Sequence, residues 1–242
     1  MNTTFPQACA FNATRWTLVL TAQNVNSAAA EVALEELCRM YWYPLYAYVR
    51  RCGHERHDAE DLTQGFFARL LAKNDLADVD RGKGRFRSFL LSAMKHFLAN
   101  ERDRQQAQKR GGDSLVIPLD VIAAESRRPL ELVDGLTPEK MFERQWALTL
   151  LDRVLNQLSA ELTAEGKAEI FSDLKEFLVG NPGPRAASGL AVRLGISEGT
   201  MKVTIHRLRR RYRTLLRDEI AQTVANPAEV DEEIHRLFAA FE

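Results

Sequence analysis

The sequence contains few cysteines and no long apolar run. Its three cysteines, Cys9, Cys38 and Cys52, have no paired spacing, which argues against a disulfide framework and against a zinc site built from thiolates. We expect them to be reduced packing residues. No segment approaches the roughly 20 apolar residues of a membrane-spanning helix, and the N-terminus lacks the basic start and apolar block of a secretion signal. These absences predict a cytoplasmic protein without membrane insertion.

Net charge is also absent, because 33 basic and 33 acidic residues balance to zero. The charges are nevertheless unevenly distributed: residues 81–112 carry +7 and residues 177–217 carry +8, whereas residues 113–176 and 218–242 carry −6 each. Two separated basic segments in a neutral chain indicate two contacts with a polyanion. A solvated charged surface is the simpler alternative.

Strand-like alternation is scarce and apolar residues recur at helical spacing, so we predict an all-α fold. At 242 residues the chain suits two small helical domains with separate cores, joined by a flexible linker. The expected parts are an N-terminal extension at 1–24, a first domain at 25–111, a linker at 112–137, a second domain containing a helix-turn-helix at 138–222, and an acidic amphipathic C-terminal extension at 223–242.

Periodicity and capping residues also predict individual helices. Pro44 falls inside the first of them, and the NPGP run at 181–184 is expected to interrupt the chain. The expected helices run from about Ser27 to Arg51, from Asp58 through Leu70, over Phe86 to Phe97, and over 139–159, 163–179, 187–194 and 198–223, with a last amphipathic segment from about Pro227.

The second basic segment includes LAVRLGISEGTMKVTIHRLRRRYR at 190–213, which has the pattern of a helix-turn-helix. Gly195 tolerates a left-handed backbone and Ser197 can cap the next helix. One side of that helix is apolar, and its other side offers short residues, base-reading side chains and phosphate-binding arginines. The candidate DNA-binding residues are Ser197, Gly199, Thr200, Lys202, Val203, His206, Arg207 and Arg210. A basic amphipathic helix that serves a protein partner or solubility is the alternative.

The first basic segment interleaves aromatic and positive side chains over residues 81–110. That mixture suits single-stranded nucleic acid, whose bases stack on flat side chains. By periodicity, Phe86, Phe89 and Phe97 are more typical of a core. Asn100 is a better candidate for reading a base because its amide both donates and accepts hydrogen bonds.

Three stretches together resemble one family: DAEDLTQGFFARLL at 58–71, FRSFLLSAMKHFLANERDR at 86–104 and the helix-turn-helix pattern at 190–213. They are similar, in this order, to the paired regions of bacterial RNA polymerase sigma factors of the extracytoplasmic-function (ECF) type. The resemblance covers roughly 25–110 and 140–218. It implies two helical domains that dock on core RNA polymerase and recognise two promoter elements, without catalysis and without a cofactor.

The resemblance also implies roles for individual residues. The DAED-like helix contacts the polymerase, the segment after it recognises and melts the downstream element, and the helix-turn-helix binds the upstream element. The implied partners are core RNA polymerase and promoter DNA, with an anti-sigma factor as a further candidate. The matching positions are Asp58, Asp61, Leu62 and Gln64 for polymerase, and Arg85, Phe89, Lys95, His96, Asn100 and Arg104 for the downstream element.

Other interpretations stay open at this point. An autonomous helix-turn-helix regulator would explain residues 186–217 but leave the two earlier motifs without a role. A metal site would rest on CGHERH at 52–57, with no distant acid–base set pointing toward it. The TRWTLVL segment can pack on the first domain. The acidic tail from Pro227 is either an extra packing helix or a mask that competes with DNA for the basic helix.

Overall fold

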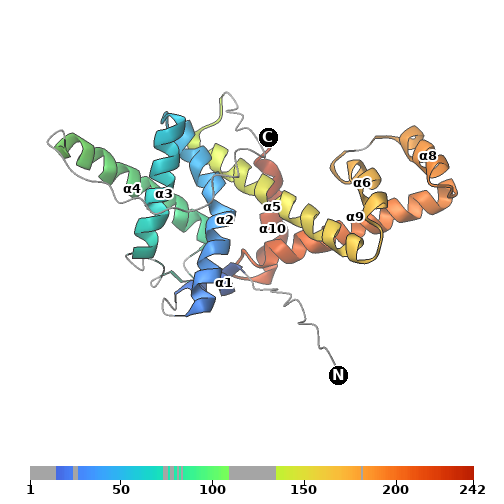
Figure 1. Cartoon of the computed structure of the whole chain (residues 1–242), viewed down its shortest axis with the longest axis horizontal. Coiled ribbons are helices and arrows are strands. Elements are labelled where there is room, and N and C mark those ends of the chain that lie inside the picture. The colour runs from blue at the N-terminus through green and yellow to red at the C-terminus, as the bar shows by residue number, and fades with distance from the viewer. Residues whose placement is uncertain are drawn as a thin grey trace, which may run out of the picture.

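The computed structural model describes residues 15–23, 27–72, 76, 79–80, 82, 84–108, 135–180 and 182–242. Its regular elements are all helical, and no β-strand occurs among these residues, which confirms the predicted all-α class (Figure 1). The helices in chain order are α1 (Arg15–Ala22), α2 (Ala28–Arg51), α3 (Arg56–Ala72), α4 (Phe86–Gln108), α5 (Pro138–Ala164), α6 (Ala168–Leu174), α7 (Glu176–Val179), α8 (Pro184–Arg193), α9 (Glu198–Ala221), the 3-10 turn η3 (Pro227–Glu229) and α10 (Val230–Ala239).

Helix α2 begins where its cap predicts and lies at the centre of the molecule. The Ser27 hydroxyl accepts a hydrogen bond from the Ala30 amide at 3.1 Å, and the helix continues through Pro44 to Arg51. Nearly every side chain from Met40 to Val49 is buried. A helix that is apolar on all sides must be covered on all sides, and α1, α3, α4 and α5 all pack on α2.

Helix α1 covers one part of α2. Trp16, Val19 and Ala22 are buried, which confirms that the TRWTLVL segment packs on the first group of helices. The Gln23 side-chain amide then donates to the carbonyls of Leu76 and Val79 at 2.8 and 2.9 Å, which ties the end of α1 to the segment before α4.

Two predicted helix starts were wrong by a few residues. Helix α3 begins at Arg56, so Asp58 lies in its first turn, where a negative charge favours the helix dipole, and does not cap it. Helix α8 begins at Pro184, three residues before the predicted start, because proline is tolerated at the first helical position, where its missing N–H has no partner to lose.

The segment predicted as one helix at 163–179 is divided in the structure. Helix α5 extends to Ala164, the chain turns at Gly166 with a φ of 73°, and α6 and α7 follow as two short helices. A left-handed φ at this position ends α5 and redirects the chain, and glycine adopts it without a steric penalty.

The two groups of helices share one core, whereas the sequence suggested two. Helix α5 packs along α2 with its first half and supports α6 and α9 with the rest. The buried apolar side chains of α1 through α10 form one contiguous cluster, which includes Leu45, Phe142, Trp146 and Ile220. Nearly all of the predicted linker lies outside the described residues, and the domain boundaries stay a prediction.

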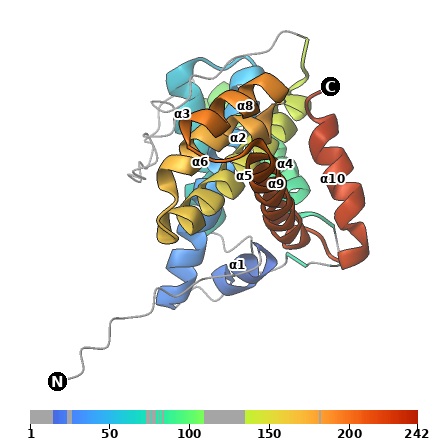
Figure 2. The same cartoon turned by 90° about the vertical axis from the view of Figure 1, so that its right-hand side faces the viewer.

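The C-terminal segment forms a packing helix. Val230 and Leu237 are buried and Ile234 and Phe241 are partly buried, so the predicted apolar stripe is confirmed. Helix α10 contacts α9 and α5, and Figure 2 shows it to one side of α9, at the edge of the molecule. The Arg144 guanidinium of α5 lies over the Phe241 ring at 5.4 Å.

The cysteines differ in their surroundings. Cys38 is buried in the core as expected, and burial together with the charge of Glu35 raises the pKa of its thiol to about 12. Cys52 is exposed at the end of α2, so its prediction as a packing residue was wrong. Cys9 lies outside the described residues.

Candidate nucleic-acid interface

The turn between α8 and α9 has the features predicted from the sequence. Gly195 has a φ of 66°, in the left-handed region that favours glycine. The Ile196 amide donates to the Ala191 carbonyl at 3.0 Å, and the Ser197 hydroxyl accepts from the Thr200 amide at 3.1 Å. These bonds close the end of α8 and cap the start of α9, so the angle between the helices is set locally.

Helix α9 buries the predicted apolar side. Met201, Ile205, Leu208 and Leu215 are buried, and Tyr212 is half-buried. Burial, with a smaller contribution from the charge of Asp152, raises the pKa of the Tyr212 hydroxyl to about 12. The opposite side of the helix is thereby directed to solvent.

All the candidate upstream-element residues are exposed and lie together on the first turns of α9. This reading face projects at one end of the molecule, and α4 extends at the other (Figure 1). Val203 is 49% exposed, so its methyl groups are accessible to a partner such as a thymine methyl group. The residues of the α9 reading face are Ser197, Gly199, Thr200, Lys202, Val203, His206, Arg207 and Arg210.

Some arginines of the basic segment are used inside the protein. Arg209 donates from Nε to the Phe177 carbonyl at 3.0 Å. Arg211 binds Glu161 of α5 through two parallel hydrogen bonds of 2.8 and 2.7 Å. The Arg211 hydrogen bond lowers the pKa of Glu161, and the same bond raises the pKa of Arg211.

Other cations of the same segment are unpaired. Within the ranges that the structure describes, Lys202, Arg207 and Arg210 form no ion pair, while Arg193 pairs with Asp173. The sequence could not separate these two sets, because both are arginine-rich and the distinction depends on which acids α5 and α6 bring nearby. The three cations of the α9 reading face are therefore among the unpaired ones of the described residues, together with Arg185 and Arg213 outside that face.

The candidate downstream-element residues divide between two sides of α4. At about 100° per residue, Phe89, His96, Asn100 and Arg104 fall within one arc, and Lys95 points away from its centre. His96, Asn100 and Arg104 are exposed and Phe89 is half-buried. These four residues form the α4 reading face.

The remaining two candidates of this group are already paired with acids from the second half of the chain. Lys95 Nζ lies 2.7 Å from Glu139 Oε1 of α5, and Arg85 Nε lies 2.8 Å from Glu233 Oε2 of α10. The Lys95 hydrogen bond is the main reason that the pKa of Glu139 is lowered. Arg85 and Lys95 therefore lie in ion pairs in this structure, and their role in binding the downstream element stays a prediction.

The phenylalanines of this segment are mostly core residues, as periodicity favoured. Phe86 is buried and meets Tyr41 edge to face, with ring centroids 5.4 Å apart. Phe97 is buried against Phe66 at 5.8 Å. Phe89 stacks on Phe86 at 5.9 Å and keeps one side accessible, so it is the aromatic ring of the three best placed to meet a base.

The candidate polymerase-binding residues lie on α3. Asp58 and Asp61 are exposed, whereas Leu62 and Gln64 are half-buried. Between them, Thr63 is fully buried and donates to the Ala59 carbonyl at 2.7 Å. The two carboxylates are therefore presented to solvent by a helix whose other side is anchored in the core.

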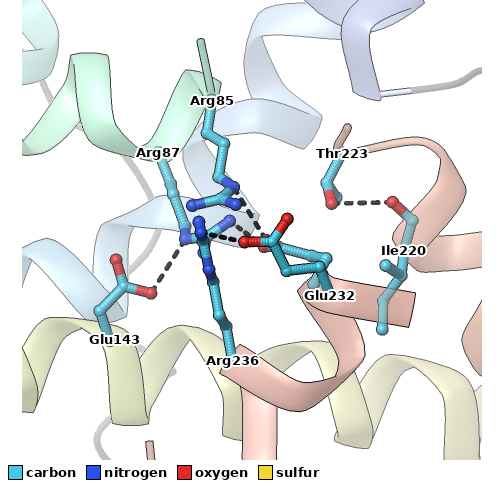
Figure 3. A network of polar contacts seen from close by, with 8 residues as sticks. Arg85, Arg87, Glu143, Ile220, Thr223, Glu232 and Arg236 are labelled. Atoms are coloured by element: carbon cyan, nitrogen blue, oxygen red, sulfur yellow. Dashed lines mark hydrogen bonds and ion pairs between the residues drawn. The ribbon is translucent and has the colours of Figure 1, made fainter. Parts of the chain in front are cut away.

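Sequence reasoning missed a polar cluster in which Arg87 and Glu233 are buried and Arg85 and Glu143 are partly buried. Figure 3 shows Arg87 of α4 and Arg85, the residue just before α4, directed toward α10, with Glu143 of α5 on the other side of Arg87. The burial of Glu233 was not predicted, because a charged residue is usually exposed. Its spacing of three from Val230 and four from Leu237 places it on the buried side of α10, which was the available signal.

The acidic tail does not cover the α9 reading face. Among the described residues, the acids of α10 pair with Arg85, Arg87, Arg217 and Arg236, none of which belongs to that face. The tail instead contacts the C-terminal part of α9, α5 and the residues at the start of α4, and its competition with DNA for the basic helix stays a prediction.

In the described parts of the chain, no three His, Cys, Asp or Glu side chains are grouped so that they can share a metal ion. No described helix combines the length and apolar character needed to cross a bilayer.

The family resemblance that the three motifs indicated is supported by comparison with known families. The family model described as ECF sigma factor matches residues 22–218. The chain belongs to the ECF sigma factor family. Searches of the curated proteins and of the solved structures found no match. Members of the family are non-enzymatic regulators that act in transcription initiation by RNA polymerase, and the matched range includes α2 through most of α9.

Proposed function

We propose that this sigma factor binds core RNA polymerase through α3 and selects promoters through two separate surfaces. The α9 reading face binds the upstream element as duplex, and the α4 reading face engages the downstream element where the strands separate. Asp58, Asp61, Leu62 and Gln64 form the polymerase contact.

The observation that carries the proposal is the division of α9 into a buried side and an unpaired basic side. Lys202, Val203 and His206 occupy its second and third turns, where a helix in the major groove meets base edges. Arg207 and Arg210 follow these positions along the same exposed side of the helix, where their guanidinium groups can bind phosphates of the DNA backbone.

The α4 reading face supports a different mode of binding. His96, Asn100 and Arg104 are exposed along one side of the helix, and Phe89 adds a partly accessible ring. Hydrogen-bonding side chains beside an aromatic surface suit unstacked bases, and capture of such bases offsets an unstacking cost of a few kcal/mol. The protein needs no nucleophile for this, because the polymerase performs phosphoryl transfer.

The test is reconstitution with core polymerase followed by genome-wide mapping of transcription starts. Lys202→Ala and His206→Ala are expected to weaken selection of the upstream element, and Asn100→Ala to weaken recognition of the downstream element. Arg236→Ala, an exposed arginine of α10 outside both faces, is the control. Unchanged start sites with all three variants would disprove the residue assignments.

The same experiment separates this function from that of an autonomous DNA-binding regulator. A sigma factor co-purifies with core polymerase, and its promoter-specific transcription depends on the Asp61 region. If the chain binds specific duplex without polymerase and Asp61→Ala has no effect, the autonomous regulator is the correct function.

A further inference from the structure

Arg87 joins three helices that are far apart in the sequence. Its side chain is 5% exposed, and its Nε donates to Glu143 Oε2 of α5 at 2.9 Å. The guanidinium lies over the Trp146 ring at 4.2 Å and also pairs with Glu233 of α10. A single side chain of α4 is therefore held by both α5 and α10 (Figure 3).

Glu233 is the partner of two arginines. Its side chain has no exposed surface, and it pairs with Arg87 and with Arg85, whose Nε lies 2.8 Å from Oε2 without the alignment of a hydrogen bond. A buried carboxylate is costly unless cations surround it. While α10 is in place, Arg85 is directed to Glu233 and is withheld from DNA.

A second set of contacts fastens α5 to the first group of helices. Lys95 pairs with Glu139 at 2.7 Å, and Arg51 Nε donates to the Leu136 carbonyl at 2.5 Å. Farther along α5, Arg153 pairs with Glu36 of α2. Lys95 is therefore neutralised by the same packing of α5 that the buried cluster secures.

These contacts are suited to opening. Buried ion pairs contribute little net stability, because their mutual attraction is offset by the loss of water, although each half is costly to leave alone. The Lys95 and Glu139 side chains are 45% and 46% exposed, so water and salt screen their attraction. A dense row of phosphates is a competing partner for both cations.

We propose that α10 is an intramolecular latch. Through Glu233 it holds the second group of helices against α4 and keeps Arg85 and Lys95 from binding DNA in the free protein. Engagement of polymerase and promoter releases it. The inference rests on the proposed function of α4, since withholding these cations matters only if that region meets DNA.

The test compares Glu233→Gln with Glu232→Gln in the full-length chain. Glutamine keeps the size of the buried side chain but removes its charge, so Arg85 loses its ion pair and Arg87 keeps only the one with Glu143. Glu232 lies on the same helix and, among the residues that the structure describes, forms an ion pair with Arg236 alone at the surface, which makes its variant the matched control. Small-angle X-ray scattering measures opening, and fluorescence anisotropy measures binding to a mixed-sequence single-stranded DNA of about 12 nucleotides.

We expect Glu233→Gln to enlarge the radius of gyration and to bind the oligonucleotide about fivefold more tightly than Glu232→Gln, in the absence of polymerase. Equal dimensions and equal affinities in the two variants overturn the latch. Expansion without a gain in affinity also overturns it, because the cations would then not be withheld.

A second variant covers the case in which Glu233→Gln fails to fold, which far-ultraviolet circular dichroism reports. Glu139→Gln releases Lys95 while removing only a half-exposed carboxylate, and Glu165→Gln, at the other end of α5 with a half-exposed pair to Lys167, is its control. Glu139→Gln is expected to bind the oligonucleotide about twofold more tightly than Glu165→Gln. No difference between them overturns the proposal.

Failure of the latch can be distinguished from failure of the proposed function. Run-off transcription by the wild-type chain with core polymerase tests the function without reference to α10. Scattering from the free variants tests opening without reference to transcription. Active transcription with no effect of Glu233→Gln in either assay removes the latch alone.

Discussion

The two basic surfaces of this sigma factor differ in how the rest of the protein treats them. On α9 the exposed cations Lys202, Arg207 and Arg210 form no ion pair within the described residues. At the start and middle of α4, Arg85 and Lys95 are paired with Glu233 and Glu139. The cations of two segments of similar net charge are thus not equally available to bind DNA. Tertiary contacts place Arg85 and Lys95 in ion pairs, whereas they leave the three cations of α9 unpaired.

The largest expected effect tests the internal role of the α4 cations. Arg87→Ala removes the buried cation that Glu233 and Glu143 share and leaves the buried Glu233 with Arg85 alone. Removal of one member of a buried ion pair typically costs 3–5 kcal/mol, and because Arg85 remains we expect the lower end, a loss of about 3 kcal/mol in the free energy of unfolding. Urea denaturation measures it. Arg104→Ala, on the exposed part of the same helix, is the control and should change stability by less than about 0.5 kcal/mol. Equal effects of the two variants would contradict the buried cluster.

The next effect tests the availability of the α9 reading face. Lys202→Ala removes an unpaired cation and is expected to weaken binding to promoter duplex about tenfold, corresponding to about 1.4 kcal/mol, with no loss of stability. Arg211→Ala is the opposite control: because Arg211 binds Glu161, the variant should lose a few tenths of a kcal/mol of stability and retain most of its DNA affinity. Anisotropy titrations over a range of salt concentrations measure the DNA affinity of both variants, and urea denaturation measures their stability. The prediction fails if Lys202→Ala binds DNA as tightly as Arg211→Ala does.

A smaller effect tests how the α9 reading face is held. Ser197→Ala removes the side-chain cap on the Thr200 amide, and loss of such a cap costs about 1 kcal/mol. We expect a lower unfolding temperature and faster amide hydrogen exchange over the first turn of α9. Ser197→Asp retains a capping oxygen, so it should restore protection. Unaltered exchange in Ser197→Ala would mean that the turn does not depend on the cap.

The smallest effect concerns the pH dependence of the Lys95–Glu139 pair. The hydrogen bond from Lys95 lowers the pKa of Glu139 from its usual 4.5. A carboxylate with a lowered folded pKa adds stability above its unfolded pKa, and this contribution disappears as the pH falls through the folded value. In Lys95→Gln, an NMR titration of the Glu139 carboxyl group should show its pKa returning toward 4.5. A pKa that does not move would place Lys95 away from Glu139 in solution.

Much of α9 was predictable because its determinants are local. Gly195 and Ser197 specify the turn by backbone conformation and capping, and the spacing of Met201, Ile205 and Leu208 selects the buried side. Errors arose where local signals compete. Pro184 both interrupts the preceding chain and starts α8, and Asp58 suits a cap as well as a first turn.

The sequence by itself determined the helical class, the family and the face of α9 that remains in solvent, since periodicity, caps and motifs act over a few residues. Only the tertiary structure decided that α2 is covered by α5, that Glu233 is buried, and which cations are neutralised. The physical reason is that an ion pair depends on the approach of side chains from distant segments, as with Arg87 of α4 and Glu233 of α10. The sequence gives the number of cations in a segment, but the fold decides which of them are paired with acids and which can bind DNA.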